Sequence, residues 1–111
     1  MPWYMTIENH DCEGSIPSLL EYASLRRTTW YLPKRYYTVD IHIDTNTMMR
    51  LLVLVACDLV CGATPRDFRC IGEMVSQTSH ASRALQYKWL DAELARPAPG
   101  GKKIWKIHYL D

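Results

Sequence analysis

Three titratable side chains on one segment are the first candidates for chemistry. Asp40, His42 and Asp44 occupy alternate positions of residues 37–44, in which every odd residue is apolar and every even residue is polar. This alternation is typical of a half-buried strand, on which side chains of one face follow each other at about 6.6 Å. Carboxylates beside an imidazole could hold a metal ion or tune a proton-transferring histidine. The alternative, which we favour, is a solvated strand face with weak electrostatic pairing.

Four soft metal ligands form a second candidate. Cys57 and Cys61 are one helical turn apart, and Cys70 and His80 follow them in the sequence. Structural zinc sites usually carry their cysteines in tight knuckles flanked by glycine, whereas both cysteines here belong to an apolar segment in which a reduced thiol packs like a small hydrophobic group. We therefore predict packing rather than zinc binding. Because no secretory signal is visible, we also expect reduced thiols, Cys12 included.

Aromatic and basic residues alternate in a third candidate. Residues 30–37 combine four aromatic rings with Lys34 and Arg35, and such a segment could bind single-stranded nucleic acid by stacking and charge. Packing of an edge strand followed by a basic turn explains the same residues, and we favour this explanation. No sequence-specific binding of nucleic acid is predicted.

The remaining residues match no catalytic motif. No serine or threonine lies in a nucleophile motif, and Gly100 and Gly101 form a turn without the further glycines and the helix of a phosphate-binding loop. The sequence therefore predicts a protein that is not an enzyme, has no cofactor and takes no small-molecule substrate.

The charge balance predicts no long-range attraction to a polyanion. Thirteen basic and twelve acidic residues give a net charge of +1, so only local basic clusters are candidates for contact with phosphate or lipid headgroups. The alternative, which we favour for each cluster, is an ordinary solvated patch. The clusters are Arg26 with Arg27, Lys34 with Arg35, and Lys102 and Lys103 with Lys106, of which the last five residues are the candidate contacts.

Large rings with a polar tip are unusually frequent. Four Trp and seven Tyr stand against one Phe, a balance that is typical of interfaces in which the ring is buried and its tip stays wet. A small core built from large rings is the alternative. The candidate interface residues are Trp3, Trp30, Tyr31 and Trp105.

The first half of the chain predicts a short strand over residues 3–7, a helix over residues 15–25 and a β-prone segment over residues 28–32. Residues 48–60 are apolar almost throughout, which predicts a buried helix that is too short to span a bilayer. A second helix is expected to begin at Thr64, before a proline.

The second half predicts fewer regular elements. Residues 76–82 predict an exposed loop, and residues 84–90 predict a strand, although the segment after them is helix-prone. Residues 97–101 contain the Pro and Gly of a turn, and residues 103–110 alternate as a final strand. Residues 1–111 are thus expected to form one compact α+β domain, with an antiparallel sheet of about four to five strands packed against two or three helices.

Two parts of this pattern resemble the core of the rhabdovirus matrix proteins, which belong to negative-strand RNA viruses. The strand at residues 36–42, the apolar helix and residues 62–68 at the start of a second helix are similar to that family's strand, long helix, basic turn and helix. Residues 85–91, a Pro/Gly turn and the strand at residues 104–110 resemble the strand pair that follows.

The resemblance implies a non-enzymatic protein that self-assembles, contacts an anionic membrane surface and binds the nucleocapsid protein. It also implies a place in the host cell cytoplasm, at the membrane and in the virion. The basic N-terminal tail and the proline-tyrosine budding motif of that family have no counterpart in this sequence. The alternative hypothesis is a small module that binds a host or viral protein through exposed aromatic rings.

Overall fold

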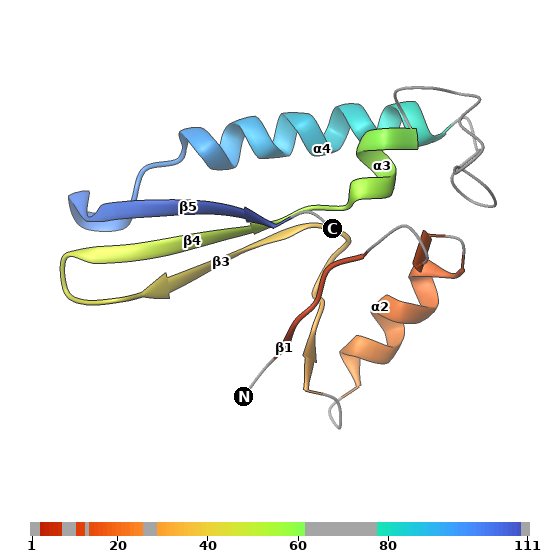
Figure 1. The fold of residues 1–111 in the computed structure, drawn as a ribbon, viewed down its shortest axis with the longest axis horizontal. Coiled ribbons are helices and arrows are strands. Elements are labelled where there is room, and N and C mark those ends of the chain that lie inside the picture. Colours follow the sequence, from red (N-terminus) through yellow and green to blue (C-terminus); the bar gives the residue numbers. More distant parts are fainter. Residues whose placement is uncertain (1–2, 8–10, 13, 26–28, 62–77, 110–111) are drawn as a thin grey trace.

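The computed structural model describes residues 3–7, 11–12, 14–25, 29–61 and 78–109. Along the chain (Figure 1), the elements are β1 (Trp3–Tyr4), α2 (Ile16–Ser24), β2 (Trp30–Tyr31), β3 (Tyr37–His42), β4 (Thr47–Val53), α3 (Ala56–Cys61), α4 (Thr78–Ala95), the 3-10 turn η2 (Pro99–Gly101) and β5 (Lys103–Tyr109).

The strands form two sheets. β3, β4 and β5 lie in this order in a three-stranded sheet, in which β4 is antiparallel to β3 and parallel to β5, and β1 and β2 form a separate parallel pair. The predicted α+β class is confirmed, but the strands are divided between two sheets and two of the three pairings are parallel. β5 is parallel to β4 because α4 carries the chain back to the end of the sheet at which β4 begins.

Several predicted elements are confirmed. β1, α2, β2, β3 and β5 all lie within the segments that the sequence assigned to them. Ser15 caps α2, because its Oγ accepts a hydrogen bond from the N–H of Ser18 (3.3 Å). In the predicted turn, Gly100 and Gly101 have φ values of 65° and 68°, which other residues adopt only with strain.

The buried helix predicted over residues 48–60 is wrong. Its first part is strand β4, and only its last part is helical, as α3. On one face of β4 the side chains of Met48, Arg50 and Leu52 are fully buried. On the other face Met49 and Leu51 are half-buried and Val53 is buried. A central strand with apolar residues on both faces shows no alternation in its sequence, and the buried charge of Arg50 hides the pattern further.

A tight turn joins β3 to β4. The Asn46 N–H donates to Asp44 Oδ1 (2.7 Å) and the Ile43 N–H donates to the carbonyl of Thr47 (3.0 Å). An Asp side chain that bonds the backbone two residues on is a common turn-forming device. The turn reverses the chain, so that the residues after 46 pair with β3 as strand β4. They therefore do not form the predicted helix.

α4 replaces the exposed loop predicted over residues 76–82, as far as that segment is described, and the strand predicted over residues 84–90. Both predictions are wrong because the inward side of α4 includes polar side chains. Gln86 is fully buried, and its amide bonds the N–H (2.8 Å) and the carbonyl (3.2 Å) of Val55. Polar residues that are satisfied in this way remove the apolar stripe by which a helix is recognised in a sequence.

α4 covers one face of the three-stranded sheet (Figure 1). Thr38, Arg50 and Lys106, one residue from each strand, bond the last turn of α4 or the residue after it. The N-terminal elements pack near the other face, at the end of the sheet where β3 begins. There Tyr37 and Val53 join Ile7 and Ile16 in one buried cluster.

A disulfide joins Cys12 to Cys57, with Cα atoms 6.6 Å apart, a separation within the usual range. Both cysteines are buried. The expectation of reduced thiols is therefore wrong for this pair, because the fold brings together two cysteines that no local motif connects. The bond ties the N-terminal elements to α3.

Several predictions concern residues outside the described part of the chain. The helix expected to begin at Thr64, all of Cys70, and the side chains of Cys61 and His80 lie there.

Candidate functional site

The surface best suited to recognition is the face of the three-stranded sheet opposite α4. Odd-numbered residues of the three strands share this face, and the pairing register aligns them in two rows across the sheet. We call these six residues the open face. One row consists of Val39, Leu51 and Ile107, and the other consists of Ile41, Met49 and Trp105.

The exposure of the open face increases from β3 to β5. Its residues on β3 and β4 are half-buried, whereas Ile107 is 46% and Trp105 is 56% exposed. Val39 and Leu51 still touch the N-terminal core cluster. The β5 side is thus the part of the open face least covered by the described residues, and apolar surface of this kind marks contact sites for other proteins.

Aromatic rings also gather on both faces of the two-stranded sheet and on α2. Trp30 meets Tyr22 edge to face at 5.0 Å between ring centroids, and Tyr31 meets Tyr4 at 5.6 Å. Trp3, the partner of Trp30 in the strand register, is 68% exposed. We call these five residues the aromatic ribbon. Of the predicted interface residues, Trp3 and Trp30 share one face of this sheet and Tyr31 lies on its other face. Trp105 lies on the open face.

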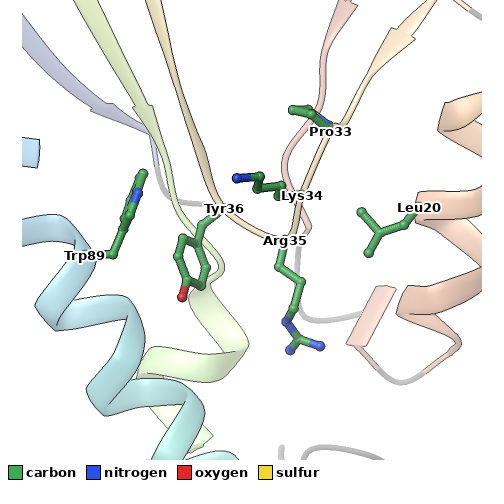
Figure 2. A pocket seen from close by; sticks show the side chains of 6 residues that line it. All are labelled: Leu20, Pro33, Lys34, Arg35, Tyr36 and Trp89. Atoms are coloured by element: carbon green, nitrogen blue, oxygen red, sulfur yellow. The ribbon is translucent and has the colours of Figure 1, made fainter.

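A pocket of about 510 Å³ lies between α2, the segment before β3, and α4. Figure 2 shows the side chain of Lys34 extending between the residues of α4 and those of α2. The rings of Tyr36 and Trp89 are only 4.8 Å apart between centroids, so no planar group fits between them. The lining residues are Leu20, Pro33, Lys34, Arg35, Tyr36 and Trp89.

The Arg35 guanidinium is already neutralised. Its Nη2 and Nε donate to the two carboxylate oxygens of Asp58, at 2.6 Å and 3.3 Å, and the Asp58 side chain is almost buried. This bidentate ion pair joins the segment before β3 to α3. Its geometry assigns Arg35 a structural role.

The predicted basic residues do not form one surface. Lys34 and Arg35 precede β3, whereas Lys102 and Lys103 lie at the opposite end of the sheet, roughly 20 Å away by the rise of six strand residues. Lys106 donates to the carbonyl of Leu94. Lys103 lies over the Trp105 ring, at 5.1 Å from its centroid, and so at the rim of the open face.

The acidic residues of β3 and the hairpin each have their own partner. Asp40 accepts from Arg50 at 2.8 Å and 3.2 Å, and this hydrogen bond lowers the pKa of the Asp40 carboxyl. His42 Nδ1 lies 3.5 Å from the ammonium of Lys102. The backbone hydrogen bonds of the hairpin turn lower the pKa of Asp44. The pairing expected from the sequence is present, but the expectation of a solvated strand face with weak pairing is wrong at Asp40, whose partner Arg50 is fully buried beneath α4. Asp44 lies in the turn after β3.

Two further findings concern the part of the chain that the structure describes. No group of three or more His, Cys, Asp or Glu side chains is placed there to hold a metal ion. None of its helices is long and apolar enough to cross a bilayer.

No protein-family model matches this chain, and neither a curated protein nor a solved structure shows significant similarity to it. The resemblance to the rhabdovirus matrix proteins therefore stays a prediction.

Sequence reasoning missed most of the open face. The available signal was three pairs of apolar residues two positions apart, at residues 39 and 41, 49 and 51, and 105 and 107. Their alignment depends on the strand register, and the helix predicted over the middle pair concealed it.

Proposed function

We propose that this protein is a non-enzymatic structural protein that self-associates through its open face. The observation that carries the proposal is the exposed Trp105 beside Ile107 on an apolar sheet face. A buried Trp covers 150–250 Å². Removing the exposed half of the Trp105 ring from water would contribute about 2–3 kcal/mol at 25 cal/mol per Å².

The pairing of β4 with β5 supports the same conclusion. Sheets built only of parallel strands almost always have both faces covered, and this mixed sheet contains one parallel pair, β4 with β5. Here α4 covers one face, and the N-terminal elements reach only the end of the other. Contact between the β5 sides of two open faces would shield the most exposed part of this surface.

The charges support self-association more than membrane contact. A net charge of +1 causes little repulsion between copies. Arg35 and Lys106 bond to groups of the same chain, which leaves cations at two distant ends of the sheet. Binding to an anionic membrane or to a nucleocapsid protein therefore rests on the resemblance alone.

Paired substitutions test the proposal. Trp105→Glu places a charge on the open face and should convert the oligomer to a monomer in light scattering. Leu85→Glu is the matched control, because Leu85 is equally exposed, at 61%, on α4. An oligomer that persists in Trp105→Glu, with an unchanged circular dichroism spectrum, would contradict the proposal.

A second candidate function is the binding of a different protein, and the aromatic ribbon favours it. Five partly exposed rings gather on one small sheet and its helix, and Tyr and Trp are enriched at the centres of interfaces. Trp3→Ser separates the two functions. Under the self-association proposal, this substitution leaves the oligomer size unchanged. Dissociation of the oligomer in Trp3→Ser would instead show that the copies contact each other through the aromatic ribbon.

A further inference from the structure

β5 forms an edge of the three-stranded sheet, and one hydrogen bond fixes the direction of its backbone groups. The N–H of Lys103 donates to the carbonyl of Asn46 (2.9 Å), next to β4. In a strand, the N–H and C=O of one residue point to the same side and alternate along the chain. The odd residues of β5 therefore direct their backbone groups toward β4, and Ile104, Lys106 and His108 direct theirs to the outer edge.

This outer edge lacks the usual protection. Exposed edges are normally blunted by proline, by a bulge, by an outward charge or by a covering segment. β5 contains no proline and pairs with β4 without interruption over all seven residues. Of its two lysines, Lys106 is held by the last turn of α4 and Lys103 lies over the Trp105 ring. No strand among the described residues pairs with the outer side of β5.

We propose that a second copy of this chain pairs antiparallel with the β5 edge and forms a six-stranded sheet across the two copies. The inference rests on the proposed self-association and specifies its geometry. A two-fold interface requires each strand to meet its own copy. The register that pairs all seven residues places the axis at Lys106.

In this register the outward groups meet as hydrogen-bonded pairs. Lys106 faces Lys106 of the second copy, and Ile104 faces His108 of the second copy in both directions. Each of these three pairs exchanges two backbone hydrogen bonds. The edge is thus complementary to itself, and the exposed Trp105 and Ile107 that this register brings together favour a second copy as its occupant.

The same register joins the two open faces. Trp105 lies opposite Ile107 of the second copy in a non-hydrogen-bonded pair, where side chains are closest, and an aromatic ring beside a β-branched side chain stabilises a sheet. The two-fold axis is perpendicular to the sheet, so both open faces lie on one side. Pairing through the β3 edge would bury less apolar surface, because Val39 and Ile41 are already half-buried.

The facing Lys106 side chains do not prevent the pairing. Both lie on the α4 side of the sheet, and each donates to the carbonyl of Leu94 in the last turn of its own helix. Carbonyls at a helix C-terminus carry partial negative charge. Each ammonium is therefore compensated within its own copy.

His108→Pro tests the edge directly. The substitution removes an outward N–H that β4 does not use, and proline is tolerated on an edge strand in this position. The dimer loses one donor from each copy, and we expect its dissociation constant to rise at least tenfold. His108→Ala is the matched control and should dimerise like the wild type in sedimentation velocity.

The outcomes separate the two proposals. A dimer of wild-type strength in a folded His108→Pro protein overturns the β5 pairing and leaves self-association standing. A wild-type protein that stays monomeric overturns both.

Hydrogen exchange of the wild type provides a second test that needs no folded variant. The amides of Ile104, Lys106 and His108 should exchange slowly at high protein concentration and rapidly at low concentration. Exchange rates of these three amides that stay constant while the protein dimerises would overturn the inference.

Discussion

Arg50 and Asp40 form a bidentate ion pair across β3 and β4, with the Arg50 side chain entirely buried. The Arg50 Nε and Nη2 donate to the two oxygens of Asp40, and its Nη1 donates to the carbonyl of Arg96 (2.7 Å). All three nitrogens of the guanidinium are thereby bonded beneath α4. The pair links the central strand to its neighbour and to the end of the helix.

Asp40→Asn should destabilise the protein by about 3 kcal/mol, because it leaves the buried charge of Arg50 without a counter-ion. Chemical denaturation measures this loss. Asp44→Asn is the matched control, since Asp44 lies in the turn just after β3, is exposed, and as Asn keeps an oxygen for the turn. Equal stability of the two variants would contradict the structural role of the pair.

Tyr37 should make the fold sensitive to alkaline pH. Its hydroxyl donates to the carbonyl of Met5 (2.7 Å) and lies 2.9 Å from that of Tyr31, and burial raises its pKa to about 12. The folded state therefore favours the neutral phenol. The resulting stability is complete below pH 10 and is lost as the pH rises to about 12, by about 3 kcal/mol in all.

Tyr37→Phe is the control for this prediction. It should lower the stability by about 1–2 kcal/mol at neutral pH, because a buried carbonyl loses its donor, and it should remove part of the loss between pH 10 and 12. Thermal unfolding at a series of pH values measures both effects. Identical alkaline profiles of the two proteins would show that another group is responsible.

The Cys12–Cys57 disulfide should contribute strongly to stability. It closes a loop with a sequence separation of 45 residues, and the chain-entropy relation gives about 4 kcal/mol for a loop of this length. Cys12→Ser combined with Cys57→Ser should lower the denaturation midpoint accordingly, while a reductant should act on the folded wild type only slowly because both sulfurs are buried.

The same bond bears on the compartment in which the protein works. Disulfides persist in oxidising compartments, so we expect Cys12 and Cys57 to resist alkylation when cells are quenched with acid and the protein is then unfolded in denaturant with the alkylating agent. Alkylation of both cysteines, detected by mass spectrometry, would instead support the cytoplasmic location that the resemblance implies.

The two tryptophans of the aromatic ribbon should differ in their effect on folding. Trp30→Ala should cost about 1–2 kcal/mol, because the ring packs edge to face on Tyr22. Trp3→Ala should change the stability by less than about 0.5 kcal/mol, since its ring is mostly exposed. A large loss of stability in Trp3→Ala would remove this residue from the candidate binding surface.

The elements that the sequence predicted correctly are those with a clear local signal, either a regular hydrophobic alternation or a characteristic cap or turn residue. β3 and β5 alternate, α2 begins after a capping serine, and glycines mark the turn before β5. β4 and α4 were not predictable in the same way, because Arg50 and Gln86 occupy buried positions at which hydrophobic periodicity predicts apolar residues. Their burial depends on partners 10 and 31 residues away.

The candidate surfaces were predictable only in part. Trp105 could be proposed from its type, but its neighbours on the open face depend on the register of three strands. The disulfide depends on the approach of two segments that are distant in the chain. The ion pair of Arg35 with Asp58 likewise requires the tertiary fold.

Sedimentation equilibrium of the unmodified protein tests self-association most directly. Over a series of concentrations, we predict an average mass that rises from 12.9 kDa for the monomer toward twice that value. A mass that stays at that of the monomer up to millimolar concentration would contradict the central claim.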